Sequence, residues 1–223
     1  MLELRHLHAW WGAAQVLFDV SLVVGSGEWV VLQGLNGAGK SSLLQTIMGL
    51  GPRSDCVLRY QNQSIADWPT HRRARFGLGY VPEDRRLFTA LTVLENLQVA
   101  AHTRPAVGAP AQRQTPAQRL ARVLELFPVL ASMLQRPAAQ MSGGEQQMLS
   151  LARTLMTGPT LLLLDEPCEG IAPVLVESIR DALLALRAQG ISMLVAEQNA
   201  ILAGCADRVI TLSAGHIANP STP

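Results

Sequence analysis

The spacing of apolar residues changes along the chain and separates expected strands from expected helices. Across residues 18–24, apolar and polar positions alternate, which is the pattern of a half-buried strand. Residues 160–164 and 191–196 are mostly apolar, without alternation, as the buried strands of a parallel sheet are. Between Pro173 and Gly190 the apolar residues recur at every third or fourth position and predict a helix. The pattern therefore predicts an α/β fold.

The middle of the chain carries the pattern of helices. A Ser or Thr followed three residues later by Glu or Gln marks three expected helix starts, at Thr92, Thr115 and Ser142. Residues 103–115 are rich in Ala, Pro, Gln and Arg and predict a surface loop. The expected organisation is a single domain, residues 1–223, in which an all-helical segment (89–159) is inserted into an α/β core with an antiparallel β part (1–88 and 160–223).

A glycine-rich turn joins the apolar run that ends at Leu32 to a helical pattern that begins near Lys40. Residues 34–41 read Gly-Leu-Asn-Gly-Ala-Gly-Lys-Ser and match the phosphate-binding pattern G-x-x-x-x-G-K-[ST]. Glycines let backbone N–H groups curl around an anion, and the helix N-terminus adds partial positive charge. Lys40 is expected to reach the β- and γ-phosphates of a nucleotide, and Ser41 to bind Mg²⁺.

Two carboxylates follow the leucines of residues 161–164. Asp165 and Glu166 therefore lie at the carboxyl end of an expected central strand, where open α/β sheets bind ligands. Asp165 is expected to meet the Mg²⁺ held by Ser41. Glu166 is expected to act as a base toward water.

A second pair of glycines begins the helix expected at Ser142. Gly143 and Gly144 in a first helical turn cost about 1 kcal/mol each relative to Ala. They also leave backbone N–H groups open at the positive end of the helix, as the binding of a phosphate requires. A phosphate site and an ordinary loop-to-helix junction both remain open for this turn.

Composition limits the possible partners. The formal net charge of +1 gives no electrostatic reason to expect nucleic acid. The start of the chain has no apolar signal core and no segment is long enough to span a bilayer, so we do not expect the chain itself to cross a membrane. The three cysteines lack metal-ligand spacing and indicate reduced thiols in a cytosolic compartment. With 48% hydrophobic and 16% charged residues, the chain is apolar enough to indicate a partner surface.

Taken together, the phosphate loop and the segments 141–147, 161–167 and 197–198 resemble the nucleotide-binding subunit of ABC transporters. The similarity covers nearly the whole chain. In detail, Val-Pro-Glu at 81–83 and the segments above look like the branched-chain amino-acid importer branch, including its urea and short-amide relatives. The resemblance implies a P-loop NTPase core, ATP and Mg²⁺ as cofactors, and ATP hydrolysis coupled to solute import.

The resemblance also implies that two such subunits pack head to tail, with ATP between the phosphate loop of one and the Ser142 turn of the other. Trp11 is implied to stack on adenine. The implied ATP-binding residues are Trp11, Gly34, Leu35, Asn36, Gly37, Ala38, Gly39, Lys40, Ser41 and Ser42, with Ser142, Gly143, Gly144 and Glu145 acting in trans.

Four positions depart from the general family pattern, and one of them is Met141, which replaces the usual Leu. Glu83 and Gln198 stand where Gln and His are commoner, and both changes look normal for this branch. By resemblance, Glu83 is expected beside Mg²⁺ with Ser41 and Asp165, and Gln198 near the γ-phosphate, so that both join Glu166 in the catalytic set. Cys168 stands where Ser or Thr is usual; we expect its alkylation to inhibit ATP hydrolysis, and a buried inert cysteine is the alternative.

The implied partners are a second ATP-binding subunit, identical or homologous, and integral membrane permease subunits that dock near residues 83–96. A solute-binding protein would act indirectly, and the chain would lie peripherally at the cytoplasmic face of the inner or plasma membrane. One alternative is the same subunit of a urea or short-amide importer. The other is a soluble ABC ATPase acting on DNA, ribosomes or protein assemblies, which usually has two cassettes, a long coiled-coil insert or basic extensions.

Overall fold

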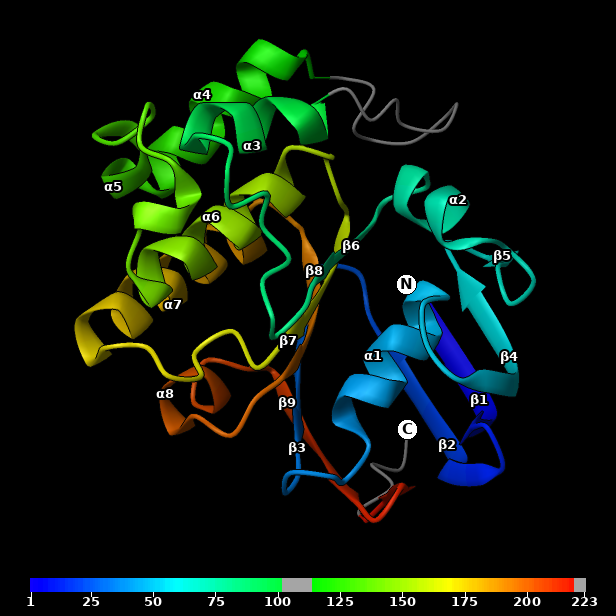
Figure 1. Cartoon of the computed structure of the whole chain (residues 1–223). Coiled ribbons are helices and arrows are strands. Elements are labelled where there is room, and N and C mark those ends of the chain that lie inside the picture. The colour runs from blue at the N-terminus through cyan, green and yellow to red at the C-terminus, as the bar shows by residue number, and fades with distance from the viewer. Residues whose placement is uncertain (102–113, 219–223) are drawn as a thin grey trace.

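Two sheets and a group of helices make up the part of the chain that our computed structural model describes, residues 1–101 and 114–218. The larger sheet has six strands in the order β10-β9-β3-β8-β7-β6 (Figure 1). Five of them, β9, β3, β8, β7 and β6, are parallel to one another. Its strands are β3 (Trp29–Gln33), β6 (Leu78–Val81), β7 (Leu161–Asp165), β8 (Ser192–Ala196), β9 (Arg208–Ser213) and β10 (His216–Ile217). The α/β fold class expected from the sequence is confirmed.

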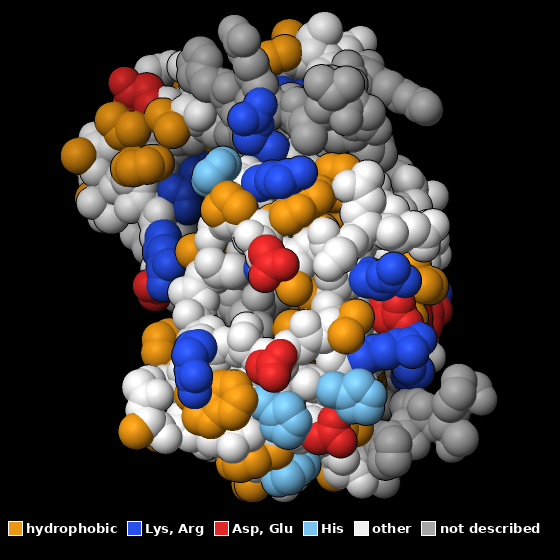
Figure 2. Space-filling model, turned by 90° about the vertical axis from the view of Figure 1, so that its right-hand side faces the viewer, with side chains coloured by type: hydrophobic (Ala, Val, Ile, Leu, Met, Phe, Trp, Pro, Cys, Tyr) orange, Lys and Arg blue, Asp and Glu red, His pale blue; other side chains and the backbone are white. Residues whose placement is uncertain are grey.

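The smaller sheet is antiparallel and lies beside the larger one, with α1 (Lys40–Met48) between them (Figure 1). Its strands are β1 (Leu2–Trp11), β2 (Ala14–Val24), β4 (Arg53–Tyr60) and β5 (Gln63–Ser64), in the order β2-β1-β4-β5. Leu43, Leu44 and Ile47 of α1 are fully buried in the core that joins the two sheets. Figure 2 shows the side of the molecule on which this sheet lies, where basic side chains are scattered among acidic, apolar and histidine side chains.

The four leucines of β7 explain why this strand shows no alternation. Leu161 and Leu163 belong to the core shared with α1, whereas Leu162 and Leu164 belong to the core on the other face of the sheet. That second core is covered by α6 (Gly143–Leu155) and α7 (Pro173–Ala188). Because both faces are buried, the four positions before Asp165 are all apolar.

Helices occupy the described chain between β6 and β7, and they form the upper left part of Figure 1. They are α3 (Val93–Ala101), α4 (Pro116–Leu126), α5 (Pro128–Ala131), the 3₁₀ turn η2 (Ala138–Gln140) and α6. The three expected capping boxes are present at Thr92, Thr115 and Ser142. The loop expected at 103–115 lies almost wholly outside the described residues. None of the described helices is long and apolar enough to span a bilayer.

Outside the helical segment expected at 89–159, two short helices of the described chain were not expected from the sequence, α2 (Thr70–Arg75) and α8 (Ala200–Ala203). Neither has an apolar period, because each is shorter than two turns. The buried side chain of Arg73 holds α2 in place. It donates hydrogen bonds to four backbone carbonyls in other segments of the same chain, those of Thr46, Ile47, Ala66 and Trp68. This element therefore depends on tertiary contacts rather than on a local pattern.

Candidate functional site

The glycine-rich turn leads from β3 into α1 and is shaped by close contacts. Gly39 has φ 105°, in the left-handed region that favours glycine. A Cβ at Gly34 would overlap the carbonyl oxygen of Leu212 on β9. α1 begins directly after this turn and has no side chain that caps its first N–H groups. These N–H groups therefore remain available to a ligand at the positive end of the helix.

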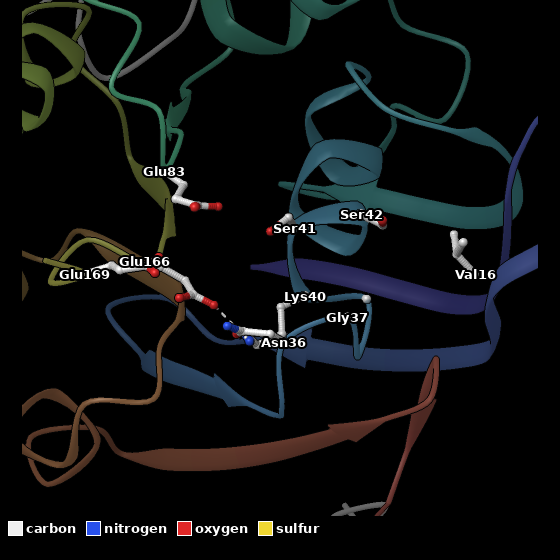
Figure 3. Close-up of a pocket in the computed structure, with 10 residues that line it drawn as sticks. Val16, Asn36, Gly37, Lys40, Ser41, Ser42, Glu83, Glu166 and Glu169 are labelled. Atoms are coloured by element: carbon white, nitrogen blue, oxygen red, sulfur yellow. Dashed lines mark ion pairs between the residues drawn. The ribbon is translucent and has the colours of Figure 1, made fainter.

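The turn forms one wall of a pocket of about 370 Å³. Figure 3 shows the loop residues on one side of it and three carboxylates, Glu83, Glu166 and Glu169, on the other. The pocket is lined by Val16, Asn36, Gly37, Gly39, Lys40, Ser41, Ser42, Glu83, Glu166 and Glu169. The structure thus brings the phosphate loop together with Glu83 and Glu166, as the sequence analysis expected, and adds Glu169.

Lys40 is the buried cation of this pocket, with only 4% of its surface exposed. Its Nζ lies 2.9 Å from Glu166 Oε1 and donates to the carbonyl of Gly34 at 2.8 Å. Glu166 has a φ of 45°, an unusual value for a residue other than glycine. An arriving phosphate would compete with Glu166 for Lys40, so phosphate binding and the freedom of the Glu166 carboxylate are linked.

Asp165 lies at the end of β7 and is 2% exposed. Its Oδ1 accepts a hydrogen bond from Ser41 Oγ at 2.9 Å, and its Oδ2 accepts one from the Tyr80 hydroxyl at 3.1 Å. Burial raises the pKa of Asp165 above its ordinary value, while these two hydrogen bonds oppose the rise. Burial also raises the pKa of Tyr80, so its hydroxyl stays a donor. The sequence analysis did not anticipate Tyr80.

The oxygens of Ser41, Asp165 and Glu83 are the hard ligands that Mg²⁺ prefers. Among the described residues no group of three or more His, Cys, Asp or Glu side chains is arranged to hold a metal alone. Mg²⁺ is usually bound through one or two carboxylates together with substrate phosphates and water. The donor set therefore suits a metal ion that arrives with a nucleotide.

Glu169 was missed by the sequence analysis. The loop after β7 turns back on itself, since the backbone N–H of Glu169 donates to the carbonyl of Glu166 at 3.2 Å. The pKa of Glu169 is raised. The larger cause is a hydrogen bond to the Glu166 side chain, and the next is repulsion from the charge of Glu166. The sequence does show a carboxylate three residues after Glu166. Only the turn of the loop, however, brings Glu169 into the same pocket as Glu166.

Gln198 also contacts the phosphate loop, but from a different side. Its Nε2 donates to Asn36 Oδ1 at 2.7 Å, and it lines a neighbouring cavity of about 650 Å³ with Leu35 and Ala38. The residue before it, Glu197, is buried and accepts three backbone hydrogen bonds, from Cys168, Gln198 and Asn199. Glu197 therefore fixes the loops after β7 and β8 to each other, a role that the sequence analysis did not assign.

Trp11 lies at the end of β1 and is 49% exposed. Its indole Nε1 donates to Ser42 Oγ at 3.2 Å, and Ser42 lines the phosphate pocket. The ring therefore stands at the edge of the phosphate pocket rather than inside it.

The Ser142 turn does not line the phosphate pocket of its own chain. Ser142 Oγ accepts from the N–H of Glu145, and Glu145 Oε2 accepts from the N–H of Ser142 at 2.7 Å. A Cβ at Gly144 would overlap Leu175 of α7, so this glycine permits close helix packing. Within one chain the structure does not bring Ser142, Gly143, Gly144 and Glu145 together with Lys40.

Cys168 lies in the loop after β7 and is buried. Burial, reinforced by the neighbouring Glu197 carboxylate, raises the pKa of its thiol to about 12. Reactive thiols need a low pKa and access to solvent. Burial and the raised pKa favour the alternative of an inert buried cysteine, and the alkylation of Cys168 stays a prediction.

The chain is similar to known proteins over most of its length. Residues 17–169 match a family described as ABC transporter. The chain is 40% identical to the high-affinity branched-chain amino acid transport ATP-binding protein BraG of Pseudomonas aeruginosa, over 97% of this chain and 91% of BraG. It is 34% identical to the lipopolysaccharide export system ATP-binding protein LptB of Escherichia coli, over 100% of this chain and 90% of LptB.

A solved structure shares the fold. The dimeric structure of a post-hydrolysis state of the ATP-binding cassette MJ0796, bound to ADP and Pi, superposes with a TM-score of 0.82 at 25% identity and covers 98% of this chain and 97% of that one. The P-loop NTPase core expected from the sequence is confirmed.

Proposed function

This chain belongs to the ABC transporter family, and we propose that it drives solute import across a membrane. It is an ATP-hydrolysing subunit, homologous to subunits of branched-chain amino-acid transport. The observation that carries the proposed chemistry is the meeting of Lys40 and Ser41 with Glu166 and Asp165 in and beside one pocket. The similarity to BraG supports branched-chain or other hydrophobic amino acids as the imported solutes.

Each side chain of the pocket has a proposed task. Lys40 and the N–H groups of residues 34–41 bind the phosphates of ATP, and Glu166 orients or deprotonates the attacking water. Ser41, Asp165 and Glu83 would hold Mg²⁺, which supplies charge neutralisation on the phosphates when bound. Gln198 reaches the γ-phosphate from the Asn36 side, and Trp11 packs on the adenine.

The second half of the site comes from another ATP-binding subunit, identical or homologous. The Ser142 turn is remote from the pocket lining of its own chain and exposes a helix N-terminus, so it is suited to the phosphates held by a neighbour. That the MJ0796 cassette forms a dimer supports this arrangement.

Integral membrane subunits are proposed to dock in an apolar groove of about 430 Å³ between α1, α2, α3 and α6. Three large apolar side chains that line it are about half exposed, Leu50, Phe88 and Val99. Exposed apolar side chains that line one hollow are typical of an interaction site. Docking there would keep the chain at the cytoplasmic face of the membrane, beside permease subunits that receive solute from a binding protein.

A second candidate is export rather than import. The similarity to LptB covers the whole chain and favours a transporter that moves lipid-linked material outward. Import is preferred because identity to BraG is higher, 40% against 34%. Import of urea or short amides stays possible for the same subunit.

The experiment is purification from membranes after extraction with a mild detergent, followed by ATPase assays in proteoliposomes. We expect co-purification with integral membrane subunits, and stimulation of ATP hydrolysis by a leucine-loaded binding protein but not by urea. Stimulation by lipopolysaccharide would favour export. Recovery of the chain wholly in the soluble fraction, bound to ribosomes or DNA, would overturn the transport proposal.

A further inference from the structure

Both carboxylate oxygens of Asp165 receive a hydrogen bond, and the two donors come from different elements. Ser41 on α1 donates to Oδ1 at 2.9 Å, and Tyr80 on β6 donates to Oδ2 at 3.1 Å. The side chain of Gln45, one helical turn after Ser41, is near the same Tyr80 hydroxyl and acts to lower its pKa, against the larger rise that burial causes. Two hydrogen bonds, one from α1 and one from β6, therefore hold the Asp165 carboxylate at the end of β7.

The strand register explains how Tyr80 reaches this carboxylate. β6 and β7 are parallel neighbours, and Tyr80 pairs with Leu163, two residues before Asp165. The Tyr80 ring packs against the core shared with α1, where a phenylalanine ring would have the same shape. The hydroxyl of Tyr80 adds to that packing a hydrogen-bond donor for Asp165 Oδ2.

We propose that Tyr80 is a positioning residue for the Mg²⁺ of this ATPase. By holding Oδ2, Tyr80 fixes the rotation of the carboxylate and leaves Oδ1 beside Ser41, which lines the phosphate pocket. Partners that hydrogen-bond a ligating carboxylate set its orientation and its affinity for the metal. The proposal rests on the assignment of Ser41 and Asp165 to Mg²⁺ made above.

The test is the Mg²⁺ requirement of Tyr80→Phe in the full chain, in a Glu166→Gln background that prevents turnover. Binding of a fluorescent ATP analogue is followed as Mg²⁺ is added, and bound Mn²⁺ is measured by electron paramagnetic resonance. We expect the half-saturating metal concentration to rise by about 10-fold or more. Binding of the same analogue in excess EDTA should stay unchanged. Gln45→Leu should give a smaller shift in the same direction, because Gln45 reaches Asp165 only through Tyr80.

Tyr60→Phe is the matched control. It also removes a tyrosine hydroxyl that bonds a side chain, but the partner is Thr160 rather than Asp165. Equal metal requirements in Tyr80→Phe and Tyr60→Phe would overturn the proposal. Equal loss of nucleotide binding with and without metal would also overturn it, since that result indicates a purely structural role. A parent chain that binds nucleotide without any metal response would instead contradict the Mg²⁺ assignment itself.

Discussion

Two helices of this protein begin with glycine-rich turns, α1 and α6, and their ends are built in opposite ways. α1 has no side-chain cap, and the side chains of its first turn are paired with acids from β7 and the loop after it. α6 has a complete capping box formed by its own Ser142 and Glu145. The turn before α1 is therefore a site assembled within one chain. The turn before α6 is capped by its own residues and does not line the pocket at the start of α1.

The largest effect is expected from Glu166→Gln, which tests the site at the start of α1. The change keeps the size of the side chain and removes the base, so hydrolysis should fall by about 10²- to 10⁴-fold. ATP binding should persist, and a dimer closed on ATP should accumulate. Steady-state ATPase assays and size-exclusion chromatography with ATP measure the two effects. Turnover at the parent rate would require another base, and Glu169 is the nearest candidate.

Ser142→Arg tests the turn before α6, which we propose acts on the ATP held by a second subunit. The substitution places bulk and charge at the start of α6, so hydrolysis should fall by about 10²- to 10³-fold, as when transition-state donors are lost. Binding of ATP to the isolated chain should not change, because Ser142 does not line its pocket. Equilibrium binding to the monomer and ATPase of the assembled complex separate these effects. Weaker binding in the monomer would place Ser142 in the core or in its own site.

The two glycines of α6 should differ from each other. A Cβ at Gly144 overlaps the terminal Cδ1 methyl of Leu175, which must shift, so Gly144→Ala should be less stable than Gly143→Ala by about 1–3 kcal/mol. A Cβ at Gly143 would lie 3.4 Å from the guanidinium of Arg85, an ordinary contact, so Gly143→Ala should raise the free energy of unfolding by up to about 1 kcal/mol. Urea denaturation of both variants is the measurement. Equal stabilities would show that α7 does not hold α6 closely.

The smallest effect is expected at Cys168, in the loop that follows Asp165 and Glu166. With a pKa of about 12, its thiolate fraction at pH 8 is about one in 10⁴ and rises about tenfold per pH unit up to pH 12. Iodoacetamide at pH 8 should leave Cys168 unlabelled and the ATPase rate unchanged, as read by peptide mass spectrometry. Fast labelling at Cys168 with loss of activity, prevented by ATP, would support the alkylation hypothesis.

Most of the regular elements could be predicted because their signals are local. Capping boxes at Thr92, Thr115 and Ser142 join residues three positions apart, and the apolar runs of β7 and β8 reflect burial on both faces. The phosphate loop is likewise a local pattern, since its glycines are needed by the backbone of the turn itself. The helix α2 escaped prediction because the carbonyl contacts of Arg73 hold it, and those carbonyls belong to other elements.

The sequence by itself determined which residue types stand at the strand ends, whereas the tertiary structure decided which of them meet. Ser41 and Asp165 are 124 residues apart, and Asn36 and Gln198 are 162 apart. They come together because the sheet order places β8 between β3 and β7 and aligns the carboxyl ends of the three strands. Tyr80 holds Asp165 only because β6 is the parallel neighbour of β7 in a fixed register. Strand order and register are long-range properties of the folded chain, and a local pattern in the sequence does not encode them.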